Sequence, residues 1–324
     1  MAPYRPADSL ASPRFSGVRT FMRLPHVSTL EDVDFVVVGI PFDDATTNRP
    51  GARFGPEAIR RASVMLRPWN AAWDVKLFDY LSGVDYGDVA IVPGYLEHSY
   101  ERITADFEAI AAAGVVPIAM GGDHSVTLGE LRGLAKVHGP LALLHIDAHL
   151  DTIDAYFGHK YNHGTPFRRA VEEGLIDTAH SLQLGIRGSN YGPEDNAGSR
   201  ALGYELITMY DYEAMGMAAV QQRIQERIGA APCFVSIDVD AADPAFAPGT
   251  GTPEIGGFSS REMLQLVRAM RGLDIRAADV VEVLPVIDPA ELTASLAATL
   301  MFELLSLLAL KRKDAAAPDV HPSE

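Results

Sequence analysis

The sequence predicts a single α/β domain: a doubly wound, mostly parallel sheet of about eight strands with helices on both faces. Short apolar runs alternate with longer segments of helical periodicity along almost the whole chain. Most of these runs are continuously apolar, which is typical of strands that helices cover on both faces. No linker or internal repeat divides the 324 residues, 48% of which are hydrophobic, so one large core is expected.

The individual elements follow from this alternation. The expected strands are Phe35–Ile40, Val115–Met120, Leu141–Ile146, Leu182–Ile186, Glu205–Met209, Cys233–Ile237 and Val280–Val283. The expected helices are Pro56–Leu66, Tyr100–Ala113, Leu128–His138, Pro166–Glu173, Ala218–Ile228, Ser260–Met270 and Pro289–Leu310. Ser259 and Glu262 have capping-box spacing, which places the start of the sixth helix. We expect the domain to cover residues 13–313, with loose polar or Ala/Pro-rich termini at 1–12 and 314–324.

Composition excludes several classes of protein. The formal net charge is −16 and spread along the chain, which argues against nucleic-acid binding because phosphate contacts need clustered Lys and Arg. The apolar stretch Leu292–Leu310 contains Glu303, which a membrane span would rarely tolerate, so we expect a buried helix. Residues 1–16 contain no apolar signal segment, and the lone Cys233 allows no intrachain disulfide. A cytoplasmic protein without a membrane partner is expected.

Acidic and histidine side chains gather where three of the expected strands end. These runs are Gly121-Gly122-Asp123-His124-Ser125, Asp147-Ala148-His149-Leu150-Asp151 and Asp238-Val239-Asp240. Ligands in open parallel sheets bind at the carboxyl ends of the strands. Alternate residues of an extended chain point to one side, so the carboxylates and imidazoles should converge. The two glycines before His124 should let the backbone turn sharply into the site.

This concentration of charge predicts a metal centre. An Asp-x-Asp pair alone is often a turn or cap, but four carboxylates at one sheet edge would repel one another strongly without cations. The predicted ligands are His124, Asp147, His149, Asp151, Asp238 and Asp240. Six side chains exceed the needs of one metal with an open position, so we expect two. Oxygen and imidazole donors without thiolate suit Mn²⁺, and also admit Ni²⁺, Co²⁺ or Zn²⁺.

The three strand-end motifs resemble those of the ureohydrolase family of arginase and agmatinase. Further matches are His163-Gly164-Thr165-Pro166-Phe167, Ser236 to Pro244, Ala247 to Glu254, and Glu282-Val283-Leu284-Pro285. They occur in order and with family spacing between Pro13 and Lys311. The resemblance implies an arginase-like fold and the hydrolysis of a guanidino compound to an amine and urea. It also implies a homo-oligomer, a trimer or a hexamer.

The resemblance further implies roles for individual residues. One metal would be held by His124, Asp147, Asp151 and Asp238, and the other by Asp147, His149, Asp238 and Asp240. His163 matches the family's proton-shuttle histidine, and Glu282 matches the glutamate that pairs with the guanidinium. The chemistry agrees, because a fixed carboxylate can orient a guanidinium and a histidine can protonate the leaving amine near neutral pH.

The segment that precedes His163 bears on the tail of the substrate. The segment Thr152–Asn162 lacks the Asn- and Thr/Ser-rich pattern with which arginases grip an amino acid head group, and the N-terminal motifs are similar to the agmatinase-like branch. That branch also includes guanidinobutyrases, guanidinopropionases and proclavaminate amidinohydrolases. The residues of this loop that we predict to contact the substrate are Asp154, Tyr156, Phe157 and Tyr161. Agmatine, giving putrescine and urea, is the first expectation. Lys160, His159 or Arg187 could instead hold the carboxylate of an ω-guanidino acid.

Two other classes of protein fit the sequence less well. A non-catalytic subunit of a hetero-oligomeric ureohydrolase would lack a metal ligand, and none is missing. A two-metal phosphoesterase uses similar ligands but needs basic side chains for phosphate, and the strand-end motifs contain none.

Overall fold

The computed structural model describes residues 3–316 and confirms the predicted fold class. The strands are β1 (Phe35–Gly39), β4 (Gly83–Asp88), β5 (Val116–Met120), β6 (Ala142–Ile146), β7 (Leu182–Ile186), β8 (Glu205–Thr208), β9 (Pro232–Asp238) and β10 (Asp274–Val281). They form one eight-stranded sheet in the order β4-β1-β5-β10-β9-β6-β7-β8, with every pair parallel. A separate antiparallel hairpin joins β2 (Trp69–Asn70) and β3 (Val75–Lys76).

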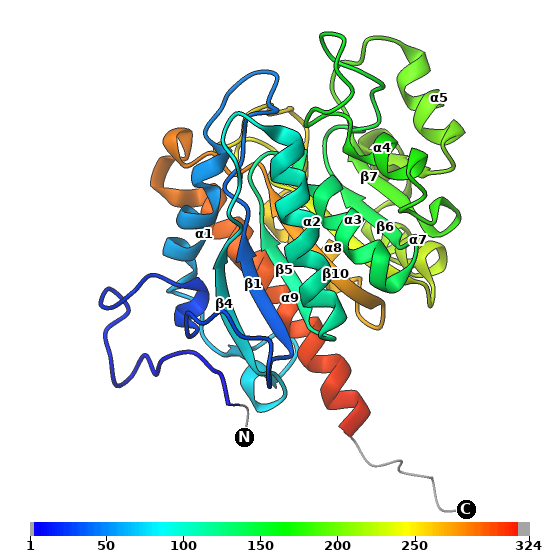
Figure 1. The fold of residues 1–324 in the computed structure, drawn as a ribbon. Helices are drawn as coiled ribbons and strands as arrows, with labels where there is room; N and C mark the ends of the chain where they lie inside the picture. Colours follow the sequence, from blue (N-terminus) through cyan, green and yellow to red (C-terminus); the bar gives the residue numbers. More distant parts are fainter. Residues whose placement is uncertain (1–2, 317–324) are drawn as a thin grey trace, which may run out of the picture.

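Helices cover both faces of this sheet (Figure 1). They are α1 (Gly55–Ser63), α2 (Leu96–Ala112), α3 (Val126–His138), α4 (Pro166–Glu172), α5 (Pro193–Ala201), α6 (Met209–Met215), α7 (Met217–Ile228), α8 (Ser260–Arg268) and α9 (Leu292–Ala316). On one face α2 packs against α3, which in turn contacts α4. On the other, α9 packs against both α1 and α8. Short 3-10 segments occur at Phe21–Arg23, Ala52–Phe54, Leu77–Asp79, Thr178–His180, Val239–Ala241, Pro285–Ile287 and Pro289–Glu291.

The sheet divides the core into two apolar layers. In β9, Cys233, Val235 and Ile237 point into the layer beneath α9, whereas Phe234 points into the layer beneath α2 and α3. This alternation follows from strand geometry, and burial on both sides explains why the strands read as continuous apolar runs. Cys233 is free and fully buried, as a small apolar residue would be.

Most differences from the predicted elements lie at the rim of the domain, but one is central: β10 spans Asp274–Val281, so the predicted strand Val280–Val283 shares only Val280 and Val281 with it. Strand β4, the hairpin β2–β3 and helices α5 and α6 were not predicted, and α9 extends to Ala316 rather than ending at Leu310. Residues 3–12 form bends and turns, while 1–2 and 317–324, which belong to the predicted loose termini, lie outside the described residues. The predicted capping box is present: Ser259 Oγ accepts from the Glu262 N–H at 3.3 Å.

Helix α9 is a core helix. With the preceding residues from Pro289 it is long and apolar enough to cross a membrane, but 83% of its most apolar window is buried inside the protein. Glu303, which is 3% exposed, accepts hydrogen bonds from Asn70 Nδ2 and Trp73 Nε1, each at 3.2 Å, and pairs with Arg268 at 2.5 Å. The buried charge is therefore neutralised by Arg268, and the two neutral donors complete its hydrogen bonds.

Candidate active site

The site lies at the carboxyl ends of the four central strands. The sheet order places β10 and β9 between β5 and β6, so the segments that follow these strands meet at one edge. His124 follows β5, Asp147 follows β6, Asp240 follows β9 and Glu282 follows β10. Segments 92 and 158 residues apart in sequence thus contribute to one cluster.

His124 lies among three carboxylates. Its Nδ1 is 3.0 Å from Asp151 Oδ2, 3.1 Å from Asp147 Oδ2 and 3.3 Å from Asp238 Oδ2. Although the nitrogen is buried, none of these contacts has hydrogen-bond geometry. A buried, unpaired imidazole nitrogen that faces three carboxylate oxygens fits a shared cation better than a hydrogen-bond network.

A second group of ligand atoms lies beside the first. His149 Nδ1 is 3.0 Å from Asp240 Oδ2 and 3.5 Å from Asp147 Oδ1, and these three residues form a cluster of potential metal ligands. Asp147 also belongs to the cluster around His124, so one carboxylate connects the two. All six predicted ligands therefore meet at one place, arranged in two overlapping groups.

The crowding of these buried carboxyl groups shifts their pKa values. Burial, together with the charges of Asp240 and Asp147, raises the pKa of Asp238 well above its usual value. Burial, with the charge of Asp147, also raises the pKa of Asp240, to about 6, against the opposing effect of His149. Burial alone would raise the pKa of Asp147, but charge and hydrogen bonds from neighbouring histidines hold it well below its usual value. Divalent cations would compensate this concentrated negative charge.

The ligands rest on a layer of buried polar side chains. His124 Nε2 lies 2.8 Å from Ser236 Oγ, which donates to Asp279 Oδ1 at 2.7 Å. His145 Nε2 lies 2.7 Å from Asp147 Oδ2. Such partners orient metal-binding side chains from behind. The sequence gives no signal for His145 or Asp279, because residues inside a strand with two buried faces resemble ordinary core positions.

The glycines before His124 serve close packing rather than a sharp turn. Neither Gly121 nor Gly122 has a positive φ, but a Cβ on Gly122 would lie 1.7 Å from the Phe42 carbonyl oxygen. Backbone strain occurs instead at two site residues, Asp151 (φ 52) and Glu282 (φ 63). Left-handed backbone is costly for residues with a side chain, and such positions cluster at functional sites.

Glu282 and His163 form a pair beside the carboxylate cluster. His163 Nδ1 lies 3.0 Å from Glu282 Oε1, which also accepts from the His124 N–H at 3.0 Å. Glu282 Oε2 is buried and has no hydrogen-bond partner. Burial lowers the pKa of His163, but the hydrogen bond and charge of Glu282, with charges from Asp123 and Asp151, raise it to about 9.

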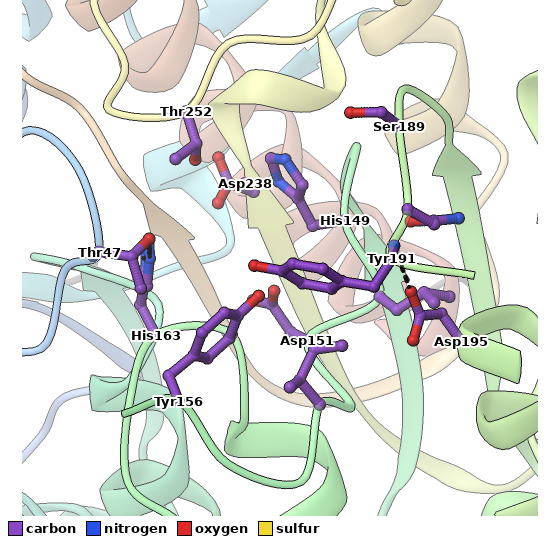
Figure 2. Close-up of a pocket in the computed structure, with 14 residues that line it drawn as sticks. Thr47, His149, Asp151, Tyr156, His163, Ser189, Tyr191, Asp195, Asp238 and Thr252 are labelled. Carbon is purple, nitrogen blue, oxygen red and sulfur yellow. Dashed lines mark hydrogen bonds between the residues drawn. The ribbon is translucent and has the colours of Figure 1, made fainter. Parts of the chain in front are cut away.

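A pocket of about 140 Å³ opens above these residues (Figure 2). Its lining includes His163 and three of the six predicted ligands, His149, Asp151 and Asp238. Glu282 is not among the lining residues and contacts His163 from behind. The other lining residues are Thr47, Leu150, Ile153, Tyr156, Gly164, Ser189, Asn190, Tyr191, Asp195 and Thr252.

Of the predicted substrate contacts, only Tyr156 lines the pocket. Asp154 instead pairs with Arg169 at 2.8 Å and with Arg168 at 3.3 Å. The Phe157 side chain is 83% exposed, and the Tyr161 ring packs edge-on against Tyr100. Asp154, Phe157 and Tyr161 are thus placed outside the pocket.

The basic residues considered for a substrate carboxylate are also outside it. Arg187 is buried, and its guanidinium donates to backbone carbonyls that include those of Asp240 and Glu254, each at 2.7 Å. His159 and Lys160 are exposed and do not line the cavity. The loop from Ser189 to Tyr191 was not predicted to take part. Its composition carries no distinctive signal, and only the fold brings it to the rim.

The chain is similar to known proteins over nearly its full length. The model of the arginase family matches residues 33–306. The chain is 47% identical to guanidinopropionase of Pseudomonas aeruginosa, with 94% of this chain and 96% of that protein covered. It is 43% identical to the mitochondrial agmatinase of Gallus gallus over 90% of this chain and 86% of the relative. The structure of proclavaminate amidino hydrolase from Streptomyces clavuligerus superposes with a TM-score of 0.89 at 41% identity, covering 92% and 99% of the two chains.

These likenesses agree with the geometry. Relatives above 40% identity over nine-tenths of the chain are amidinohydrolases, and the chain carries a His/Asp site suited to two metals. The chain belongs to the arginase family, and it is an agmatinase-like hydrolase of the C–N bonds of linear amidines.

Proposed function

We propose that the protein hydrolyses a short ω-guanidino acid to urea and an amino acid, using two divalent cations bound by His124, Asp147, His149, Asp151, Asp238 and Asp240. The observation that carries this proposal is Glu282 Oε2, a buried, unpartnered carboxylate oxygen between the metal cluster and His163. A buried acceptor without a donor is costly, and a guanidinium supplies both the donor and the opposite charge.

Glu282 and the residues around it would have different roles in the hydrolysis. Glu282 would hold and orient the guanidinium, and the pocket would fix its carbon over the metal cluster. Two bound dications would supply the nucleophile by lowering the pKa of a water molecule. His163 would provide the proton that the departing amine needs, as its contact with Glu282 keeps it beside the substrate. Mn²⁺ is the metal we propose, because the donors are carboxylate oxygens and imidazole nitrogens.

The tail of the substrate is proposed from the rim and the relatives. The outer wall offers the neutral donors Tyr156, Ser189, Asn190 and Tyr191, which can hydrogen-bond a carboxylate. Guanidinopropionase, guanidinobutyrase and proclavaminate amidinohydrolase are among the relatives at 41–47% identity. We therefore place the ω-guanidino acid ahead of agmatine. Agmatine is the second candidate, because Asp195 also lines the pocket and the described lining contains no Lys or Arg.

We also propose the bounds of the catalytic domain, the cellular location of the protein and its oligomeric state. We take residues 13–313 as the catalytic domain and the cytoplasm as its location. We propose a homotrimer or homohexamer from the family resemblance, and the N-terminal segment, where Leu10, Phe15 and Val18 are 97%, 79% and 79% exposed in the single chain, offers apolar surface to a second chain. Apolar side chains so exposed on one segment are typical of an interface. Light scattering should give a multiple of three chains, and a monomer would refute this proposal.

The test of the proposed function is urea release from a panel of guanidines. The panel contains 3-guanidinopropanoate, 4-guanidinobutanoate, agmatine and arginine, with a phosphate monoester as the control for phosphoesterase chemistry. We expect kcat/KM for the better guanidino acid to exceed that for agmatine more than tenfold, which is about 1.4 kcal/mol. Agmatine ahead by that margin would select the second candidate. No urea from any guanidine would refute amidine hydrolysis and leave a non-catalytic subunit.

A further inference from the structure

Neither ring nitrogen of His163 is free in this structure. Nδ1 lies 3.0 Å from Glu282 Oε1, and Nε2 lies 2.7 Å from Thr47 Oγ1 and accepts the Thr47 N–H at 3.1 Å. A proton that leaves Nδ1 for the pocket would have to displace Glu282. A proton that leaves Nε2 meets the Thr47 hydroxyl first. Figure 2 shows Thr47 and His163 side by side on one wall of the pocket, and both line it.

Thr47 is held rigidly in this position. Asp43, which is 2% exposed, accepts from the N–H groups of Gly51 at 2.6 Å and Arg53 at 3.2 Å, which closes the loop that carries Thr47. The Ala45 carbonyl accepts the His163 N–H at 3.1 Å, so the loop also contacts the His163 backbone. Asn48 Nδ2 donates to the Gly251 carbonyl at 3.0 Å on the far side. The loop is thus fixed at both ends and in the middle.

The two groups of Thr47 act differently on Nε2. The backbone N–H only donates, so it pairs with an unprotonated Nε2 and favours the tautomer with the proton on Nδ1. The hydroxyl can rotate, and it either donates to unprotonated Nε2 or accepts from protonated Nε2. Among residues 3–316, Oγ1 has no other hydrogen-bond partner. The hydroxyl therefore suits both protonation states of the ring, which a relay requires.

We propose that Thr47 is the proton relay between His163 and the departing amine, an inference that rests on the proposed amidine hydrolysis. The imidazolium Nε2–H passes its proton to Thr47 Oγ1, and Oγ1 passes its own proton to the leaving nitrogen. The C–N bond breaks, its electron pair stays on that nitrogen, and the amine departs neutral or protonated by solvent. His163 ends as the neutral ring with its proton on Nδ1, where Glu282 accepts it.

Kinetics of three variants test the relay. Thr47→Val keeps the size and the backbone N–H but removes the hydroxyl, and should lower kcat on the best guanidine roughly 10²-fold with KM nearly unchanged. Thr47→Ser restores a hydroxyl and should recover most of that loss. Thr46→Val is the matched control, since Thr46 belongs to the same loop but bonds the Asp43 carbonyl at 3.3 Å and does not line the pocket. Equal kcat for Thr47→Val and wild type, or no recovery with Thr47→Ser, would overturn the relay.

A second readout does not depend on turnover. Nuclear magnetic resonance of histidine-labelled, metal-free protein follows the titration of His163, whose charged neighbours Glu282, Asp123 and Asp151 are the same in every variant. Loss of the hydroxyl removes the acceptor of Nε2–H, so Thr47→Val should lower the pKa of His163 by about one pH unit, and Thr47→Ser should not. An unchanged pKa in Thr47→Val would refute the Thr47–His163 contact. The absence of urea from wild type together with the expected pKa change would instead refute the proposed function.

Discussion

Glu282 combines three features at the scale of a single residue. Its backbone is in the left-handed region at φ 63, its Oε1 accepts from the His124 N–H, and its buried Oε2 has no partner. Glycine would relieve the backbone strain but would remove the carboxylate. The strained position therefore places a charge where only a ligand can complete its hydrogen bonds.

The charge of Glu282 should matter more than its shape. Glu282→Gln keeps the volume but replaces a charge-assisted hydrogen bond to the guanidinium with a neutral one, which costs about 1.5–3 kcal/mol. We expect kcat/KM to fall roughly 10- to 100-fold while metal content, measured by elemental analysis, stays the same. Glu254→Gln removes one charge from a neighbouring loop and should have little effect. Wild-type kcat/KM in Glu282→Gln would contradict the proposed role.

The raised pKa of His163 has a consequence for the stability of the metal-free protein. Its pKa is about 9 in the fold against an ordinary value of 6.5, so the imidazolium stabilises the fold fully below pH 6.5. That contribution is lost as the pH rises through about 9. Urea denaturation should show the advantage of wild type over His163→Asn shrinking across this window, by a few kcal/mol at most, since one pKa unit corresponds to about 1.4 kcal/mol. A difference that is constant from pH 6 to pH 9 would contradict this account.

At the scale of elements, the sequence predicts the buried apolar strands but not the strands and helices of polar composition. Six of the seven predicted strands match observed strands closely, and the seventh, Val280–Val283, overlaps only the end of β10, whose first residues Asp274-Ile275-Arg276 are partly polar. Strand β4 has the composition Gly-Val-Asp-Tyr-Gly-Asp and little β propensity. It forms because it pairs with β1, where Gly83 leaves room for the Phe35 ring and Asp85 pairs with buried Arg60 at 2.8 Å. Helix α5 is similar, since only Ser199 among its residues is buried. Tertiary contacts, which periodicity does not report, determine such elements.

Glu303 is a buried charged residue in the apolar helix α9, and we expect it to be essential for the stability of the fold. Glu303→Ala would leave Arg268, Asn70 and Trp73 without their shared acceptor. We expect the free energy of unfolding to fall by about 2–3 kcal/mol, somewhat less than for a fully buried pair because Arg268 is partly exposed. Glu291→Ala, which removes a surface pair with Arg61, should cost at most about 1 kcal/mol. Equal effects in chemical denaturation would contradict the role given to Glu303.

At the scale of the whole molecule, the strand order creates the site. Local motifs were enough to name the six candidate ligands, because Asp and His at alternate positions after apolar runs are unusual. They could not show that β10 and β9 lie between β5 and β6, which brings Glu282 to His124 and Asp240 to the Ala148 N–H. They also could not place Thr47 or the loop from Ser189 to Tyr191, whose positions depend on the assembled fold. The rim of the pocket is thus the part of the site that the sequence predicts least.

Metal titration of the metal-free protein, with urea release as the readout, tests the central claim most directly. The two overlapping ligand groups predict that activity on the best guanidine rises with added Mn²⁺ and saturates at two ions per chain. Asp240→Asn, which alters the group around His149, should bind one ion tightly and lose most activity. Saturation at one ion per chain, or urea release from protein without metal, would contradict a two-metal amidinohydrolase.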